Sequence, residues 1–392
     1  MRPSDALRVF LDCYNCDFDY LRRDIPFVNY VRDRKDADVH ILVTTQATGS
    51  GGTEYVFKFI GLGRFEHVDD ELKYLAQETQ TSDERRHGYA EILKLGLVRY
   101  VMSTGTADQL RLVYRPDAAA AAPAASALQD PWDFWSFRVR GNGSINGEAS
   151  NKSRNVSSSM SANRTTEAWK INLSVNLNVH TNEFTLSDGG TLTDSSHDHG
   201  VGGLVVKSLG EHWAVAGRGR VGSTTFLNED RSTRLAAGVE YNVFPYADSS
   251  RRELTFQFTT GVNHFKYLET TIYGKDRETA ADGVLLSSFH VRQPWGSSGL
   301  SLETATYFHD LTRHRMVVNG NIDVRLFKGF SITMDASASR IHDQLYLASD
   351  SASDEEILLR RRQLATSYRY RFAAGVSYTF GSIFNNVVNT RF

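Results

Sequence analysis

The chain has 392 residues, a formal net charge of −2 and a mean hydropathy of −0.37. The near-neutral charge gives no sign of a nucleic-acid partner, and none is expected. We find no window approaching the roughly 18 unbroken apolar residues that a membrane-spanning helix requires. This excludes a helical membrane protein but not a β-barrel, whose strands need only every second residue to be apolar.

Residues 1–116 mix strand and helix patterns and predict a small α/β domain of order β-α-β-β-α-β. Pro26 is expected to bend the first helix or to start its second part. Thr81 and Glu84 have capping-box spacing, and Ile92, Leu95, Val98 and Met102 form the expected apolar stripe of the second helix. The predicted elements are a strand over 7–13, a helix over 18–33, two strands joined at 49–52, a helix over 81–104 and a strand over 109–114.

An Ala/Pro-rich linker is predicted over residues 117–131. The chain opens with MRPSDALRVF, which lacks the basic and then apolar pattern of a secretory leader. If the protein is exported, a signal peptide is therefore expected to have been removed from this numbering.

Residues 132–392 predict strands throughout. The stretch Trp169–His180, WKINLSVNLNVH, alternates strictly between apolar and polar side chains. Successive strand side chains point to opposite faces, so one face meets an apolar and the other a polar environment. About twelve such segments can be counted, and short connections alternate with longer polar ones such as 146–154, 186–198 and 347–363. An even strand number with this asymmetry is typical of a closed up-and-down barrel in the bacterial outer membrane.

The polar side chains of these segments suit the interior of a barrel, because Asn, Ser, Thr and Gly alternate with spaced charges. Tryptophans near strand ends suit an interfacial belt. A soluble sandwich or a β-solenoid remains the alternative. The predicted interior charge network comprises Arg138, Arg140, Lys170, Arg218, Arg220, Glu240, Glu303, Asp323, Arg325, Asp335, Arg369 and Arg371, and the predicted belt comprises Trp135, Trp169, Trp213 and Trp295.

On these features, residues 132–380 resemble the transmembrane β-barrels of Gram-negative outer membranes. Such barrels usually end in an aromatic-rich strand with a final Phe, as RFAAGVSYTF does at Phe380. The segment GSIFNNVVNTRF follows, so either the assembly signal is internal or the tail up to Phe392 folds back. Residues 1–116 resemble small periplasmic α/β modules such as the TolB amino-terminal domain.

Four further motifs are candidate sites. Cys13 and Cys16 are spaced C-x-x-C between a strand and a helix, where a redox pair would lie. The neighbouring Asp17 and Asp19 oppose thiolate formation, so a structural disulfide or two idle thiols is the favoured interpretation. His197, Asp198 and His199 are expected in an outer loop without enough ligands for a metal.

Ser288 and His290 are neighbours on the same side of a strand, and no third catalytic partner can be named for them. Residues 355–362, EEILLRRR, suggest an interaction helix or a continued hairpin near lipopolysaccharide. No cofactor and no metal are expected.

The favoured hypothesis is a non-enzymatic outer-membrane anchor. Its barrel would contact lipid and lipopolysaccharide, and residues 1–116 would meet an envelope partner from the periplasm. The first alternative is a diffusion or uptake channel in which interior arginines select anionic solutes. A third, less favoured hypothesis is an outer-membrane hydrolase.

Overall fold

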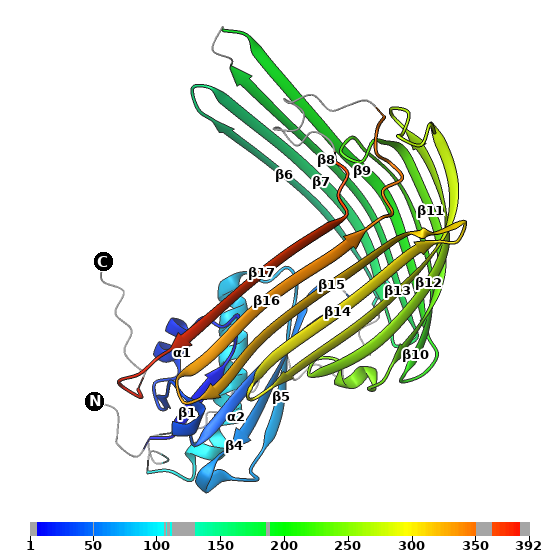
Figure 1. Cartoon of the computed structure of the whole chain (residues 1–392). Helices are drawn as coiled ribbons and strands as arrows, with labels where there is room; N and C mark the ends of the chain where they lie inside the picture. The colour runs from blue at the N-terminus through cyan, green and yellow to red at the C-terminus, as the bar shows by residue number, and fades with distance from the viewer. Residues whose placement is uncertain are drawn as a thin grey trace.

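The computed structural model describes residues 6–49, 51–105, 107, 110–111, 130–185, 189–349 and 363–384. They form a small mixed α/β domain followed by a large curved antiparallel sheet (Figure 1). The predicted strand over 109–114, the linker over 117–131 and the segment 355–362 lie wholly or mostly outside the described residues.

The α/β domain has a five-stranded sheet of order β2-β1-β3-β4-β5. Strand β1 pairs in parallel with β2 and β3, whereas β3, β4 and β5 are antiparallel neighbours. Its elements are β1 (Arg8–Asp12), α1 (Phe18–Asp24), β2 (Asn29–Tyr30), η1 (Arg34–Asp36), β3 (Val39–Ala47), β4 (Thr53–Gly61), η2 (Gly63–Phe65), β5 (Asp70–Ala76) and α2 (Ser82–Val101).

The first predicted helix is too long and must be corrected. Helix α1 ends at Asp24, and Asn29–Tyr30 form the short parallel strand β2 instead. Pro26 explains the stop, because proline disfavours helical geometry in the residue before it and cannot donate a helical hydrogen bond. Strand β5 was not predicted, since its alternation is hidden by charged residues.

The second helix has the predicted capping box, in which the Thr81 side chain and Glu84 satisfy each other's backbone amides. Its predicted apolar stripe is wrong at two of four positions, although Ile92 packs against the core. Leu95 and Met102 are 59% and 56% exposed, and the buried side is formed by Tyr89, Leu93, Leu97 and their neighbours. The side that faces the sheet therefore combines aromatic residues with Leu93 and Leu97, and it is rotated away from the predicted stripe.

One face of the small sheet carries the main core, where Val9, Ile41 and Phe57 pack under α1 and α2. The other face carries Phe10 and His40. His40 is fully buried although neither helix covers this side. Another part of the molecule must therefore shield it from water.

The large sheet has twelve strands in sequential order from β17 to β6, and every neighbouring pair is antiparallel. This confirms the predicted up-and-down fold behind a small α/β domain. The strands are β6 (Trp135–Gly147), β7 (Asn151–Thr165), β8 (Trp169–Thr185), β9 (Thr191–Ser208), β10 (Trp213–Thr224), β11 (Glu229–Asn242), β12 (Arg252–Tyr267), β13 (Arg277–Gln293), β14 (Gly296–Tyr307), β15 (Asp310–Phe327), β16 (Phe330–Ile341) and β17 (Tyr368–Tyr378).

The sheet is strongly curved but open, with β6 and β17 as its two edges (Figure 1). Within the described residues these two strands do not pair with each other. None of the described helices is both long and apolar enough to cross a bilayer.

The strand register places polar and apolar side chains on opposite sides of the whole sheet. Pairing aligns one continuous row from β17 to β13, namely Arg371, Ser337, Asn319, Ser301 and Ser288. We call the side that carries this row the polar face. The next row, on the apolar face, contains Phe372, Leu300 and Phe289.

The connections of the sheet differ in part from the expected short and long alternation. One end holds the connections 166–168, 209–212, 243–251, 294–295 and 328–329, and we call it the domain end. At the far end, the predicted loops 146–154 and 186–198 are largely strand, because β7 begins at Asn151 and β9 at Thr191. Strands β8 and β9 reach 17 and 18 residues, well beyond the about ten that cross a bilayer.

Candidate functional site

The unshielded face of the α/β domain is covered by the domain end of the large sheet. Arg325 of β15 donates from its two terminal guanidinium nitrogens to the two carboxylate oxygens of Asp12 at the end of β1, at 2.6 and 2.8 Å. Its Cζ lies 5.3 Å from the centre of the Phe10 ring. The large sheet therefore supplies the partner for the charge and the aromatic ring on this side.

His40 lies behind Asp12 in the same contact. Its Nε2 is 3.4 Å from Asp12 Oδ2, and its ring centre is 5.1 Å from that of Phe10. Burial lowers the pKa of His40, and Asp12 only partly offsets this. Burial would raise the pKa of Asp12, but the hydrogen bonds from Arg325 and the nearby His40 outweigh it and hold that pKa well below its usual range.

The turn between β15 and β16 makes a second contact with the domain. Lys328 forms an ion pair with Asp36, and the Gly329 amide donates to the Asp33 carboxylate at 2.6 Å. Gly329 has a φ of 74°, a conformation that glycine adopts without strain. The turn thus presents one cation and one free amide to two aspartates of the segment around η1.

The segment after β17 makes a third contact. The Arg32 guanidinium donates to the carbonyls of Phe380 and Gly381, and the Arg32 amide donates to the Ile383 carbonyl at 3.0 Å. Val31 and Phe384 form an antiparallel bridge. The chain beyond Phe380 therefore folds back onto the α/β domain as far as it is described, while Phe392 lies outside the described residues.

A fourth contact reaches the opposite edge of the large sheet. Glu78, between β5 and α2, forms ion pairs with Arg138 and Arg140 of β6. The β3–β4 turn approaches the same region, because a Cβ built on Gly49 would collide with the side chain of Thr165. The α/β domain consequently holds both the first strand and the end of the last strand of the sheet.

All twelve predicted charge-network residues lie on the polar face, as the register requires. No ion pair among the described residues joins two of the twelve. Arg325, Arg138 and Arg140 instead pair with the α/β domain, and Glu303 pairs with Arg315 at 2.8 Å. Whether the twelve act as one network remains a prediction.

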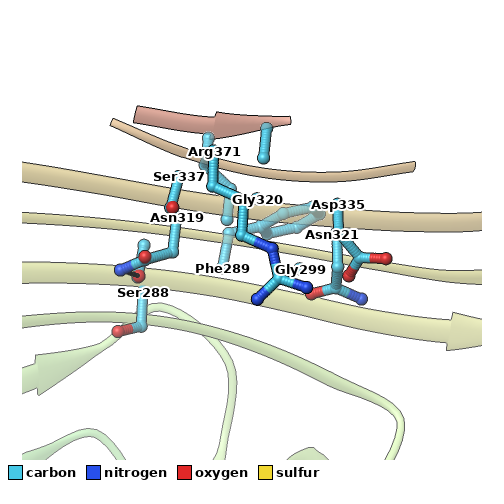
Figure 2. Close-up of a pocket in the computed structure, with 12 residues that line it drawn as sticks. Ser288, Phe289, Gly299, Asn319, Gly320, Asn321, Asp335, Ser337 and Arg371 are labelled. Atoms are coloured by element: carbon cyan, nitrogen blue, oxygen red, sulfur yellow. Dashed lines mark hydrogen bonds between the residues drawn. The ribbon is translucent and has the colours of Figure 1, made fainter. Parts of the chain in front are cut away.

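Two hollows of the polar face gather six of these residues. A cavity of about 460 Å³ is lined by Lys170, Arg218, Glu240 and Glu303. Another, of about 700 Å³, is lined by Asp335 and Arg371, and Figure 2 shows Arg371 extending toward Asp335 and Asn321. Apolar side chains such as Leu204 and Leu286 also line the first hollow, and no histidine lines either hollow.

Sequence reasoning missed a two-point ion pair between two strands of the polar face. Arg234 of β11 donates twice to Asp282 of β13, at 3.0 and 2.9 Å, across the intervening strand β12. Gly261 of β12 leaves the space, because a Cβ there would lie 3.2 Å from Asp282 Oδ1. A charge two strands away from its partner, with glycine between them, gives no local sequence signal.

At the far end, residues 344–349 turn back into the polar face. Leu345 is 2% exposed and packs with Phe265, Tyr267 and Ala280. Asn228 donates to the carbonyls of Glu269 and Tyr346 at 2.9 and 3.1 Å. An apolar plug therefore fills part of the polar face at this end.

The four predicted belt tryptophans all lie at the domain end. Trp135, Trp169 and Trp213 begin their strands, and Trp295 lies in the β13–β14 turn. Lys207 stacks over the Trp169 ring at 5.3 Å. Their common level is compatible with the predicted belt, and contact with lipid remains a prediction.

Cys13 and Cys16 form a disulfide immediately after Asp12. The bridge closes the loop between β1 and α1, next to the contact with Arg325. The expected outer-loop position of His197, Asp198 and His199 is wrong, since all three lie within β9. Among the described residues no group of three or more His, Cys, Asp or Glu could hold a metal ion.

Ser288 and His290 both lie on the polar side of β13. Ser288 lines the hollow of Figure 2 together with Asn319 and Ser337. His290 pairs in register with Gly299 and Glu253. A serine nucleophile with a histidine base is therefore not assembled at this position.

No known family model matches the chain, and no curated protein matches it. Among solved structures, it is similar to the crystal structure of the beta domain of the Bordetella autotransporter BrkA. That similarity has 14% identity, covers 63% of this chain and 98% of the other, and gives a TM-score of 0.27. Such a TM-score is too low to establish a shared fold, and the architecture rests on the strand pairing of the chain itself.

Proposed function

We propose that the chain is an outer-membrane β-barrel that holds an α/β interaction domain against its periplasmic end. The observation that carries the proposal is the separation of side chains over all twelve strands. Exposed apolar residues such as Phe372 and Leu300, at 63% and 52%, share one face, while charged and amide side chains share the other. A lipid-facing outside and a wet inside account for both faces.

Closure of the sheet follows from the same environment. Strands β6 and β17 run antiparallel through the sequential order and leave two edges of unpaired backbone groups. An edge in hydrocarbon costs several kcal/mol for each unsatisfied group. In the membrane we therefore expect β6 and β17 to pair and complete a twelve-stranded barrel.

The domain end is assigned to the periplasm. Both chain termini of the barrel lie there, and the tryptophans share that level. In bacterial barrels with an even strand number, the termini lie on the periplasmic side. The α/β domain would then lie at the periplasmic end of the barrel, close to the inner leaflet of the outer membrane.

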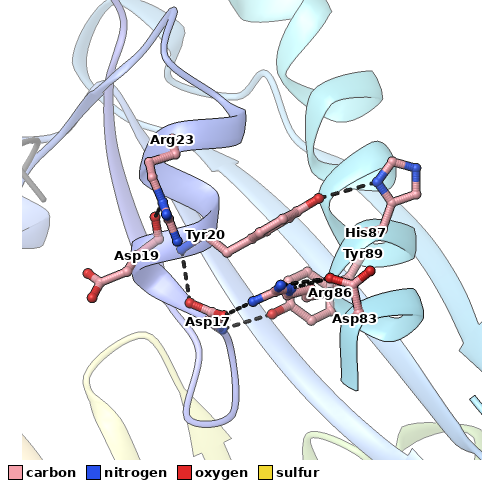
Figure 3. A network of polar contacts seen from close by, with 8 residues as sticks. All are labelled: Asp17, Asp19, Tyr20, Arg23, Asp83, Arg86, His87 and Tyr89. Carbon is pink, nitrogen blue, oxygen red and sulfur yellow. Dashed lines mark hydrogen bonds and ion pairs between the residues drawn. The ribbon is translucent and has the colours of Figure 1, made fainter. Parts of the chain in front are cut away.

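The helical side of the domain is the surface free to meet an envelope partner. A polar network holds α1 and α2 together, in which Arg86 pairs with Asp17 and Asp83 and stacks over Tyr20 (Figure 3). Leu95 of α2 and Met102, which caps its C-terminus, are exposed. A firm helix pair with exposed apolar side chains is a suitable protein-binding surface.

An open channel is less well supported. The α/β domain contacts β6, β15 and the segment after β17 at one end, and the Leu345 plug fills part of the polar face at the other. Both features obstruct a path along the polar face. Among the described residues, no assembled catalytic group supports a hydrolase.

Membrane fractionation and gel migration test the barrel. We expect the protein in the outer-membrane fraction, with faster migration on a detergent gel before heating than after. Recovery from the soluble fraction without detergent would contradict the barrel.

Site-specific photocrosslinking tests the interaction surface. Photoreactive residues at Leu95 and Met102 should capture one and the same envelope protein in cells. The matched control at Glu71 on β5 should not capture it. Equal capture from all three positions, or capture from none, would contradict a partner on α2.

A further inference from the structure

A third cavity lies at the junction between the α/β domain and the chain after β17. It has a volume of about 820 Å³. Residues from both parts of the chain line it: Ala6, Arg8, Arg34, Lys35, Ala37, Asp38, Leu62, Gly63, Arg64, Ile383 and Phe384. The cavity is complete only while the domain is docked, because Ile383 and Phe384 belong to the segment that folds back.

The acidic and the basic side chains of the segment around η1 point to different places. Asp33 and Asp36 face the β15–β16 turn, where they bind Gly329 and Lys328. Arg34 and Lys35, from the same short segment, line the cavity instead. The two aspartates therefore bind the large sheet, whereas Arg34 and Lys35 line the cavity.

The cavity is strongly positive. Four cationic side chains and one carboxylate line it, which leaves three positive charges. Asp38 already has two partners, Arg8 at 2.9 Å and Arg64 at 3.8 Å. Among the described residues no acid pairs with Arg34 or Lys35. The buried Nε atom of Arg34 also has no hydrogen-bond acceptor among the described residues.

An unsatisfied buried guanidinium nitrogen costs free energy that an anionic ligand would recover. Arginines are suited to phosphate oxygens because their donors are planar and fixed. The charge and the free donor therefore both point to a phosphate group rather than to a neutral ligand.

The other wall of the cavity is apolar. Leu62 belongs to a small apolar cluster with Phe10, Val31 and Ala37. Ile383 and Phe384 complete this wall, and Phe384 is 50% exposed. A free phosphate ion would leave this wall in water, whereas a ligand that joins a phosphate to hydrocarbon would cover it.

We propose that this cavity binds the phosphate headgroup of an anionic phospholipid, with the start of its acyl chains against Phe384. The segment 381–384 directly follows the last strand at the domain end, so the cavity lies at the level where lipid headgroups are expected. The proposal rests on the membrane location given above. Its consequence is that lipid binding stabilises the docked position of the α/β domain.

Lipid titration of the full-length protein tests this site. The purified chain in a neutral detergent is titrated with short-chain phosphatidylglycerol, with short-chain phosphatidylcholine and with inorganic phosphate. Binding is followed by native mass spectrometry and calorimetry. We expect phosphatidylglycerol to bind at least about tenfold more tightly than either other probe, which corresponds to about 1.4 kcal/mol.

The double variant Arg34→Gln/Lys35→Gln should lose at least about tenfold of this affinity. Lys73→Gln is the matched control, because it removes a cation from β5 of the same domain, outside the cavity. It should bind like the unaltered chain. Arg34→Lys keeps the charge without the planar donors and should give an intermediate affinity.

Three results would overturn the proposal. They are equal affinity for the two lipids, an unchanged affinity in the double variant, and inorganic phosphate binding as tightly as phosphatidylglycerol. Heat-modifiable migration is recorded for every variant. If the barrel is folded but shows no lipid preference, lipid binding at the cavity is refuted and the proposed function still stands. If the unaltered chain shows no heat-modifiable migration, the proposed function itself is refuted.

Discussion

Arg325 and Asp12 form a two-point ion pair although 313 residues separate them in the chain. Arg325 belongs to the polar face of the large sheet, and Asp12 ends the first strand of the α/β domain. The pair therefore joins two units that the sequence presents as independent.

Loss of the Asp12 charge should weaken the docking of the α/β domain on the large sheet. Asp12→Asn keeps the shape of the side chain but removes the charge-assisted pairing, which we expect to cost about 1–3 kcal/mol of docking free energy. Limited proteolysis between the two units should become several-fold faster. Asp83→Asn on the helical side is the control, and an equal acceleration there would contradict the role of Asp12.

Exchange of the two charges offers a separate check. Arg325→Asp alone should place like charges together and undock the domain more completely than Asp12→Asn. The combination Asp12→Arg with Arg325→Asp should restore part of the protection from proteolysis. Absence of any restoration would mean that burial, rather than the pair, holds the domain.

Acidification should destabilise the α/β domain through His40. Burial lowers the pKa of His40, so the folded domain favours the neutral ring, whereas the unfolded chain takes up a proton near pH 6.5. The stabilisation is complete above that pH and declines as the pH falls through it. The contribution of Asp12, whose pKa is lowered, persists to lower pH and declines below about pH 4.

Urea unfolding followed by circular dichroism of α1 and α2 measures this effect. The midpoint should be lower at pH 5 than at pH 7.5. His40→Gln should flatten the dependence between these values, because glutamine does not titrate. A slope that persists in the variant would assign the effect to another group.

Removal of the disulfide should weaken the domain without affecting the barrel. Cys13 and Cys16 close a loop with a sequence separation of 3, for which loop entropy gives about 2 kcal/mol. The double variant Cys13→Ser/Cys16→Ser should therefore unfold at lower urea and retain heat-modifiable migration. An unchanged urea midpoint would show that the bridge does not stabilise the domain.

Release of the far-end plug should widen the path along the polar face at its far end. Asn228 has a φ of 55° and binds the carbonyls of Glu269 and Tyr346, so Asn228→Ala loses these bonds and adopts the strained backbone less easily. Single-channel recordings should show higher conductance for the variant than for the unaltered chain. Ser301→Ala, within β14, is the control. Equal conductance of all three proteins would contradict the plug.

Several features of the fold could be predicted from short stretches of the sequence. Alternation in Trp169–His180 fixes which side chains of β8 share a face, because strand geometry has a period of two. The Thr81–Glu84 box marks the start of α2 through local hydrogen bonds. Other features were not: the stop at Asp24, the short strand β2 and the inward side of α2 depend on packing against the sheet.

The sequence by itself determined that twelve alternating segments separate a polar from an apolar environment, and that an α/β unit precedes them. Both follow from periodicity, which each segment carries independently of the others. Only the tertiary structure decided that Arg138, Arg140 and Arg325 serve the α/β domain, that Arg234 meets Asp282 across Gly261, and that Ile383 and Phe384 complete a basic cavity. Ion pairs and cavities between segments that are distant in the sequence form only where the fold brings those segments together. No local sequence pattern predicts that distance in space.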